Sequence, residues 1–137
     1  MPTEQPLQFK IATSADEFEA IFRLNYRTFV EEIPQHPANP TGRLIDRYHL
    51  ENEYAICLQG AQVVGMICGR TSRPFSLDGK LADLDQYLPP CRHTVEVRLL
   101  AVQPAHRRGA VVCVCGCQRG QRGPERGRDR ARIRGTS

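Results

Sequence analysis

The fold predicted for this chain depends on the stretch EVRLLAVQPAHRRG, residues 96–109. Together with the two residues before it, its apolar first half predicts a strand over residues 94–102, which Pro104 ends. The basic turn Arg107-Arg108-Gly109 follows where a helix would begin. Backbone N–H groups in such a turn form an anion site, and the two arginines add positive charge, so a pyrophosphate is the ligand that it fits. A solvated basic turn is the alternative interpretation.

Upstream, the sequence predicts a short strand and an amphipathic helix. Residues 8–12 alternate apolar with polar or small side chains, as a strand does. Ser14 and Glu17 have the spacing of a capping box, and Pro34 should end the helix that it begins. Residues 34–42, with three prolines and a glycine, form an irregular loop of the kind that often lies over a binding site. The helix aligns five apolar residues on one face: Phe18, Phe22, Tyr26, Phe29 and Ile33.

A β-hairpin is predicted next. Residues 54–59 and 62–70 are apolar runs joined by Gly60-Ala61, a pair suited to a two-residue turn with the glycine at positive φ. Residues 71–80 are rich in turn formers. The spacing of Leu81, Leu84 and Leu88 then predicts a short helix that Pro89-Pro90 ends.

Length and composition predict one folded unit. With 137 residues, 40% of them apolar, the chain can bury a core without disulfide or metal support. No apolar run approaches the roughly 18 residues of a membrane span, and the N-terminus MPTEQ lacks the pattern of a secretory signal. We therefore expect a soluble, cytoplasmic protein with no membrane association, in which Cys57, Cys68 and Cys91 are reduced thiols.

The character of the sequence changes after residue 110. Residues 1–109 carry 12 Lys and Arg against 13 Asp and Glu, whereas residues 110–137 carry 7 Arg against 2 acidic residues. From Gln118 onward only Ala131 and Ile133 are apolar, which is too few to offset the entropy cost of ordering the segment. We therefore expect a partial domain over residues 1–110 and a disordered Arg/Gly/Cys-rich tail over residues 111–137.

The order of elements over residues 8–110, with the stretch 96–109, resembles the Gcn5-related N-acetyltransferase (GNAT) superfamily. The resemblance implies an α/β (α+β) fold with a mixed, mainly antiparallel sheet flanked by helices, incomplete at the C-terminus. It also implies an acyltransferase that uses acyl-CoA or acyl carrier protein as donor and no metal. In that family the central strand and the loop after it hold the donor. The matching cofactor-binding positions here are Leu100, Ala101, Val102, Arg107, Arg108 and Gly109.

A narrower resemblance comes from residues 23–32, RLNYRTFVEE, with three polar residues further along the chain. It looks like the N-acyl amino acid synthases and the acyl-homoserine lactone synthases, which take long acyl chains from acyl carrier protein or CoA. The resemblance implies a small amine or an amino acid as acceptor. A second guanidinium, Arg98, adds a group able to hold an acceptor carboxylate. The substrate-binding positions are then Tyr26, Phe29, Asp46, Arg70 and Arg98, with Glu96 completing the pocket.

Glu96 is the catalytic candidate. An amine that attacks a thioester arrives protonated, so a base must remove a proton directly or through water. Backbone N–H groups near residues 100–102 would stabilise the oxyanion that forms. Each candidate also has a structural interpretation: core packing for Tyr26 and Phe29, an exposed sheet edge for Arg70, a turn for Asp46, and an exposed ladder for Glu96 with Arg98.

The tail leaves other interpretations open. One interpretation of its abrupt start is a truncation or a reading-frame shift near Gly109, under which the half-sheet after the central strand would be missing and this chain would be inactive. Taken at face value, the basic tail predicts nonspecific or incidental nucleic-acid binding through phosphates. A metal site at Cys113, Cys115 and Cys117 is disfavoured because alternating thiols in an extended segment point to opposite faces.

Overall fold

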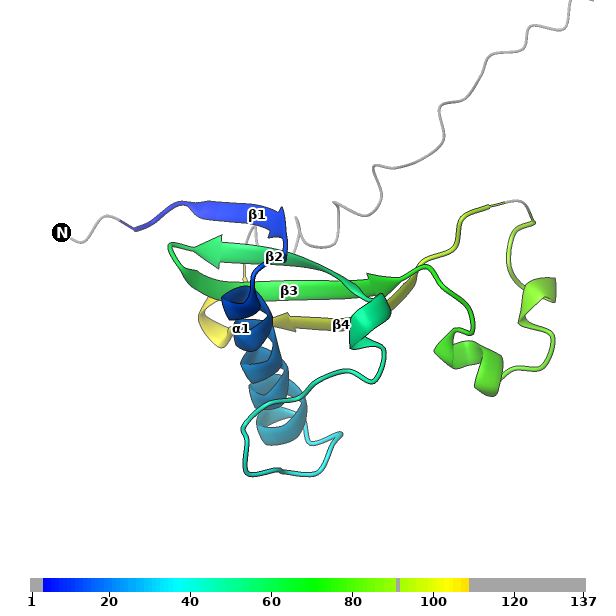
Figure 1. The fold of residues 1–137 in the computed structure, drawn as a ribbon, viewed down its shortest axis with the longest axis horizontal. Helices are drawn as coiled ribbons and strands as arrows, with labels where there is room; N and C mark the ends of the chain where they lie inside the picture. The colour runs from blue at the N-terminus through cyan, green and yellow to red at the C-terminus, as the bar shows by residue number, and fades with distance from the viewer. Residues whose placement is uncertain (1–3, 91, 109–137) are drawn as a thin grey trace, which may run out of the picture.

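The computed structural model describes residues 4–90 and 92–108. Four antiparallel strands form one sheet in the order β1-β2-β3-β4. One α-helix, α1 (Ala15–Tyr26), lies against a single face of this sheet (Figure 1). The predicted α/β class with a mainly antiparallel sheet is confirmed. The strands are β1 (Leu7–Ile11), β2 (Glu53–Gln59), β3 (Gln62–Arg70) and β4 (Glu96–Val102).

The capping box at the start of α1 is present as predicted. Ser14 Oγ accepts a hydrogen bond from the Glu17 N–H at 3.2 Å, and Glu17 Oε1 accepts one from the Ser14 N–H at 3.0 Å. Lys10 of β1 donates to the same carboxylate at 3.0 Å. Hydrogen bonds from Lys10 and from the backbone of Ser14 and Thr13 lower the pKa of Glu17 to about 2. The cap therefore also ties the helix to β1.

The helical segment continues beyond α1 in a wider form. After Tyr26 it becomes a π-helix, η1 (Arg27–Glu32), so helical structure ends before Pro34 as predicted. Ile33 lies just outside it with φ of −121° and is 49% exposed. Its predicted place on the apolar face is wrong, because the i→i+5 turn of a π-helix shifts residues away from the 3.6-residue period.

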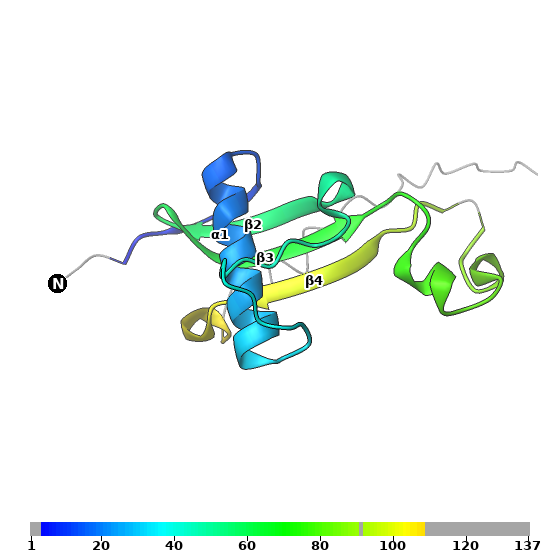
Figure 2. The same cartoon turned by 60° about the horizontal axis from the view of Figure 1, so that its bottom comes forward.

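The main core lies between α1 and the sheet. Figure 2 shows α1 running across the strands. Ile21 and Phe22 of α1 are buried against residues of three strands, namely Tyr54, Ile56, Met66, Cys68 and Ala101. The opposite sheet face carries a second apolar group of Ala55, Cys57, Val64, Ile67 and Val102. β2 and β3 are therefore apolar on both faces, as is typical of central strands.

β2 and β3 form the predicted hairpin, and β3 then pairs with β4. Gly60 in the hairpin turn has a φ of +62°. Between β3 and β4 the register shifts, because Cys68 lies opposite Leu99 whereas Gly69 lies opposite Val97. β4 thus contains one extra residue, Arg98, at a β-bulge. Among the described residues, β4 is an edge strand of the sheet.

The connection between β3 and β4 extends beyond the end of the sheet (Figures 1 and 2). It contains the 3₁₀ turns η3 (Ser76–Gly79) and η4 (Leu84–Gln86). The short helix predicted from Leu81 to Leu88 is only the single turn η4. Asp83 enters that turn with a left-handed φ of +56°, which interrupts the helical path. The last strand begins at Glu96, two residues later than predicted.

Some predictions fall outside the described residues: the boundary near residue 110, the disordered tail with its cysteines and nucleic-acid alternative, the reduced thiol of Cys91, and Gly109. In residues 4–90 and 92–108, Cys57 and Cys68 are buried. No helix of this part of the chain is long and apolar enough to cross a membrane. The same part contains no group of three or more His, Cys, Asp or Glu side chains able to hold a metal ion.

Candidate functional site

Charged and polar side chains gather where β3 ends and β4 begins. Arg70, the last residue of β3, lies opposite Glu96, the first residue of β4. The chain after α1, including the turn η2 (His49–Glu51), and the β3–β4 connection add further side chains. We call this assembly the polar cluster, and its members are Asp46, Tyr48, Glu51, Asn52, Arg70, Ser76, Glu96 and Arg98.

The β-bulge brings part of the cluster onto the sheet face that α1 covers. In a regular strand Arg98 would share a face with Leu100, and Leu99 would point to the other side. In the structure Leu99 packs on the α1 core while Arg98 reaches Asp46, and Leu100 is 45% exposed. Because of the extra residue, the charged Arg98 and its apolar neighbour Leu99 lie on the same side of β4.

Arg98 and Asp46 form a bidentate ion pair. Arg98 Nε lies 2.7 Å from Asp46 Oδ2, and Nη2 lies 2.8 Å from Oδ1, with side chains that are 14% and 9% exposed. Asn52 Nδ2 donates to Asp46 Oδ2 at 2.7 Å. Burial alone would raise the pKa of Asp46, but hydrogen bonds from Arg98 and Asn52 and the charge of Arg98 hold it below its ordinary value. Asp46 is therefore ionised at neutral pH.

Arg70 is buried and engaged through all three of its guanidinium nitrogens. Nε and Nη2 contact Glu51 Oε2 at 2.9 and 2.8 Å. Nη1 donates to the Pro74 carbonyl at 2.6 Å. The Arg70 side chain is 1% exposed, whereas that of Glu51 is 47% exposed. The partner on the solvent side of this pair is therefore the carboxylate.

The Tyr48 ring is a shared surface for the arginines. The guanidinium carbon of Arg70 lies 3.7 Å from the ring centroid, and those of Arg98 and Arg47 lie 4.7 and 4.6 Å from it. The negative face of an aromatic ring attracts cations. Tyr48 thus helps like-charged side chains to occupy neighbouring positions.

One oxygen of the Glu96 carboxylate accepts hydrogen bonds, and the other accepts none from the described residues. Its Oε1 accepts a hydrogen bond from the Ser76 N–H at 2.8 Å and another from the Ser76 hydroxyl. Its Oε2 is buried and accepts no hydrogen bond from the described residues. Burial alone would raise the pKa of Glu96, but the Ser76 hydrogen bonds and the charges of Arg98 and Arg70 hold it below its ordinary value. Glu96 is therefore an ionised, partly buried carboxylate, and its Oε2 faces Arg98 Nη1 and Arg70 Nη1 at 3.6 and 3.8 Å without a hydrogen bond.

The polar cluster joins the apolar core through Tyr54. The Tyr54 hydroxyl lies 3.0 Å from His49 Nδ1 and 3.4 Å from Asn52 Nδ2. Phe18 and Phe22 of α1 pack edge-on against the His49 ring, with centroids 5.4 and 4.9 Å away. Burial raises the pKa of Tyr54 to about 12, so its hydroxyl remains protonated at neutral pH.

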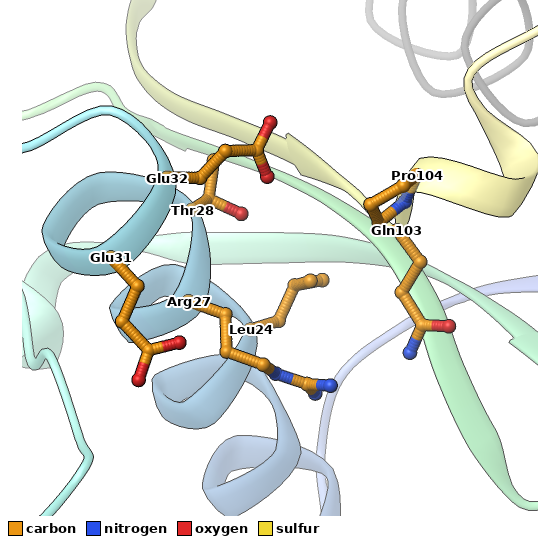
Figure 3. Close-up of a pocket in the computed structure, with 7 residues that line it drawn as sticks. All are labelled: Leu24, Arg27, Thr28, Glu31, Glu32, Gln103 and Pro104. Atoms are coloured by element: carbon orange, nitrogen blue, oxygen red, sulfur yellow. The ribbon is translucent and has the colours of Figure 1, made fainter.

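A pocket of about 370 Å³ lies at the other end of β4 (Figure 3). In Figure 3, Gln103 and Pro104 lie across this pocket from the residues of the helical segment. Gln103 of the pocket follows Glu96 by seven positions along β4, a span of roughly 23 Å at 3.3 Å per residue. The pocket is therefore not where a substrate meets Glu96. It is lined by Leu24, Arg27, Thr28, Glu31, Glu32, Gln103 and Pro104.

Arg107, which follows the turn η5 (Pro104–His106), is paired beside this pocket. Its Nη2 lies 2.7 Å from Glu32 Oε2, its Nη1 contacts Glu32 Oε1, and its Nε donates to the Val102 carbonyl at 3.0 Å. The two side chains are 39% and 38% exposed. An anion at the predicted bend would compete with Glu32 for this guanidinium.

Four of the residues predicted to form a site lie together in the polar cluster: Asp46, Arg70, Glu96 and Arg98. The structural alternatives for three of them are wrong. Arg70 is 2% exposed rather than lying on an exposed edge, and the side chains of Glu96 and Arg98 are each 14% exposed rather than forming a solvated ladder.

The other predicted site residues lie elsewhere. The Tyr26 hydroxyl donates to the Asn39 carbonyl at 3.1 Å and so fastens the irregular loop to α1. Phe29 packs on the core. In β4, Ala101 and Val102 are buried and Leu100 is partly exposed, while Arg108 is exposed.

Sequence reasoning missed four members of the cluster: Tyr48, Glu51, Asn52 and Ser76. Tyr48 follows Asp46 by two positions, in a segment whose sequence suggests only a turn. Ser76 lies in a turn-rich segment, 20 residues from the carboxylate that it contacts. No local pattern indicates a contact of that range.

Comparisons with known proteins agree with the fold. Residues 24–116 match the profile of the acetyltransferase (GNAT) domain family. Among solved structures, the AHL synthase LasI is similar, with a TM-score of 0.59 and 16% identity over 85% of this chain. The match spans 64% of the length of that protein. No curated protein matches the chain.

Proposed function

The chain belongs to the acetyltransferase (GNAT) domain family, and on that premise we propose that it is an N-acyltransferase. The donor is an acyl thioester, acyl-CoA or acyl carrier protein, and the acceptor is the amine of a small molecule or an amino acid. The fold shared with an AHL synthase supports the acyl chemistry at the level of architecture. The polar cluster supports the placement of that chemistry at the start of β4.

One oxygen of the Glu96 carboxylate is the observation that carries this proposal. Glu96 Oε2 is buried and accepts no hydrogen bond from the described residues, whereas Glu96 Oε1 and both oxygens of Asp46 accept hydrogen bonds from Ser76, Arg98 or Asn52. Glu51 contributes only Oε2 to its pair and is half-exposed. Glu96 Oε2 is thus the buried atom of the cluster best suited to take a proton from an amine.

The reaction follows from that atom. The amine nitrogen attacks the thioester carbonyl carbon, a C–N bond forms, and the C–S bond breaks. The proton released by the nitrogen passes to Glu96 Oε2, directly or through one water. Backbone N–H groups near residues 100–102, on the edge of β4 that no described strand covers, stabilise the oxyanion, and the departing thiolate takes its proton from water.

For an amino acid acceptor, Arg70 is the preferred carboxylate partner. Both arginines of the cluster are already paired, so a substrate carboxylate must displace a resident one. Glu51 is 47% exposed, whereas Asp46 is 9% exposed and also holds Asn52. Displacing Glu51 from Arg70 therefore disturbs less buried structure, and the substrate carboxylate would form the same charge-assisted contacts.

The proposal is tested by incubating the full chain with acetyl-CoA or a long-chain acyl-CoA and a panel of amino acids. Free thiol is measured by a colorimetric reagent and the N-acyl product by mass spectrometry. We expect product, and we expect Glu96→Gln to reduce kcat by about 10²- to 10⁴-fold, the usual contribution of a general base. Glu4→Gln, a change at an exposed carboxylate, is the control. Absence of product with every donor, or an unchanged kcat in Glu96→Gln, would refute the proposal.

A further inference from the structure

We propose that Ser76 is a positioning residue that makes the two oxygens of Glu96 unequal and so decides which of them receives the proton. This inference rests on the proposed function. Ser76 is the first residue of η3, on the β3–β4 connection, and it reaches Glu96 from outside the sheet. Its hydroxyl contacts both Glu96 Oε1 and Arg98 Nη1.

The direction of these hydrogen bonds follows from the donors available. Arg98 Nη1 lies 2.8 Å from Ser76 Oγ, and a guanidinium can only donate. A serine hydroxyl has one hydrogen, which is then left for Glu96 Oε1. The Ser76 N–H points to the same oxygen at 2.8 Å. Oε1 therefore accepts two hydrogen bonds while Oε2 accepts none from the described residues.

This asymmetry has a chemical consequence. Hydrogen bonds to a carboxylate oxygen stabilise its charge and make that oxygen a weaker base. They also fix the side-chain torsions, so Oε2 is held in one place. Ser76 thus directs protonation to Oε2 and prevents the carboxylate from rotating.

The charged groups that face Glu96 do not produce the same asymmetry. Arg98 Nη1 and Arg70 Nη1 form ion pairs with Oε2 at 3.6 and 3.8 Å, beyond hydrogen-bond distance, so their charges lower the pKa of the carboxyl group without a hydrogen bond to either oxygen. Each has a shorter contact elsewhere, to Ser76 Oγ and to the Pro74 carbonyl. The carboxylates nearest to these arginines are Asp46 and Glu51, and both are paired with them. Within residues 4–90 and 92–108, only Ser76 donates a hydrogen bond to Glu96.

The position of Ser76 is set by the segment around it. Arg73 binds Asp78 through Nε at 2.9 Å and Asp85 through Nη1 at 2.8 Å. Asp78 Oδ2 also accepts the Phe75 N–H at 2.5 Å, and Phe75 is 6% exposed. Ser76 is therefore held on a fastened turn and not on a free loop.

The first test is kinetic. Ser76→Ala keeps the backbone contact and removes only the hydroxyl. We expect kcat to fall roughly 10- to 100-fold, since a hydrogen bond to a charged group is lost. We expect KM to change less than about 2-fold and the acid limb of the pH–rate profile to move to higher pH, because Glu96 must be ionised to act. Ser76→Thr should restore both values, and Ser72→Ala, an exposed position on the same connection, should change neither.

The second test does not need turnover. In protein labelled with ¹³C at the glutamate carboxyl groups, the Glu96 signal is identified by its loss in Glu96→Gln. We expect its titration midpoint to be higher in Ser76→Ala than in the wild type and to return in Ser76→Thr. If Ser76→Ala does not fold by circular dichroism, Ser76→Cys, which keeps the size but is a weaker donor, takes its place.

The results separate the two proposals. A Glu96 midpoint that is the same in wild type and Ser76→Ala overturns the role of Ser76, whatever the activity. So does a kinetic loss that Ser76→Thr fails to restore. A wild-type chain without acyl transfer refutes the proposed function, and a shifted Glu96 midpoint would still establish that Ser76 controls this carboxylate.

Discussion

The two ends of β4 present the same interaction, an arginine paired with a carboxylate, in two different surroundings. At the start of the strand Arg98 and Asp46 are nearly buried and share further partners. Beyond the end of the strand Arg107 and Glu32 are more than a third exposed beside an open pocket. The comparison teaches that the geometry of an ion pair does not by itself determine how much the pair contributes to stability. A buried pair is costly to break, whereas an exposed pair is screened by water and salt.

The largest effect is expected from breaking the buried pair on one side only. Asp46→Ala leaves the Arg98 guanidinium without its main partner, and we expect the free energy of unfolding to fall by about 3 kcal/mol. A double-mutant cycle measures the coupling of the pair: urea denaturation is compared for the wild type, Asp46→Ala, Arg98→Ala and the double variant Asp46→Ala/Arg98→Ala. A loss near zero in Asp46→Ala would mean that the buried ion pair contributes no more to stability than the exposed pair at the other end of β4.

The second largest effect is expected from acid, which should reduce the stability that the buried end of β4 provides. The pKa values of Asp46 and Glu96 are below their ordinary values of 3.8 and 4.5, so the unfolded chain binds more protons than the folded one in acid. Their stabilising contribution is complete above about pH 5 and is lost as the pH falls through 4.5 and below. Urea midpoints between about pH 3 and pH 7 should show this fall, and Asp46→Asn/Glu96→Gln should flatten it.

The capping box contributes to the same acid range, because the pKa of Glu17 is lowered to about 2. Glu17→Gln is therefore the matched background for the acid series. If the fall is as steep in Asp46→Asn/Glu96→Gln as in the wild type, the acid sensitivity belongs to the cap or to other groups and not to the polar cluster.

A smaller effect is expected at Glu51, which pairs with Arg70 from the solvent side. In Glu51→Gln the Arg70 guanidinium keeps a neutral side chain beside it, but the carboxylate that competes with the substrate carboxylate is removed. We expect KM for an amine that carries a carboxylate to fall a few-fold, and KM for the same amine without its carboxylate to stay unchanged. An equal change in both would remove Arg70 from the recognition of the acceptor.

The smallest effect is expected at the exposed pair. Arg107→Ala should shift the urea midpoint only slightly at low salt, and the shift should disappear at about 1 M NaCl, where the Debye length is about 3 Å. Arg108→Ala, a neighbouring exposed arginine, is the control. A large, salt-independent loss in Arg107→Ala would mean that this end of β4 is as tightly organised as the other.

Local signals in the sequence predict much of the fold. The capping box of α1 and the Gly60 turn depend on residues two to four positions apart, and both are present. The π-helix after Tyr26 and the bulge at Arg98 were missed, because neither changes the apolar pattern in a way that differs from a plain helix or strand.

Part of the candidate site could also be predicted from local signals. Arg70 ends one predicted strand and Glu96 lies near the start of the next, and the pairing of these strands brings the two residues together. The contact of Ser76 with Glu96 and that of Arg107 with Glu32 join residues 20 and 75 positions apart. Contacts of this kind depend on the three-dimensional path of connections, which has no periodic signature in the sequence.

The ring of Tyr48 gives the cluster a component that acid does not remove. Protonation neutralises carboxylates, but the quadrupole of an aromatic ring holds no exchangeable charge, so its attraction for guanidinium groups persists. Arg47, Arg70 and Arg98 all lie over this one ring. The contribution of Tyr48 to the polar cluster therefore does not depend on the protonation state of the carboxylates around it.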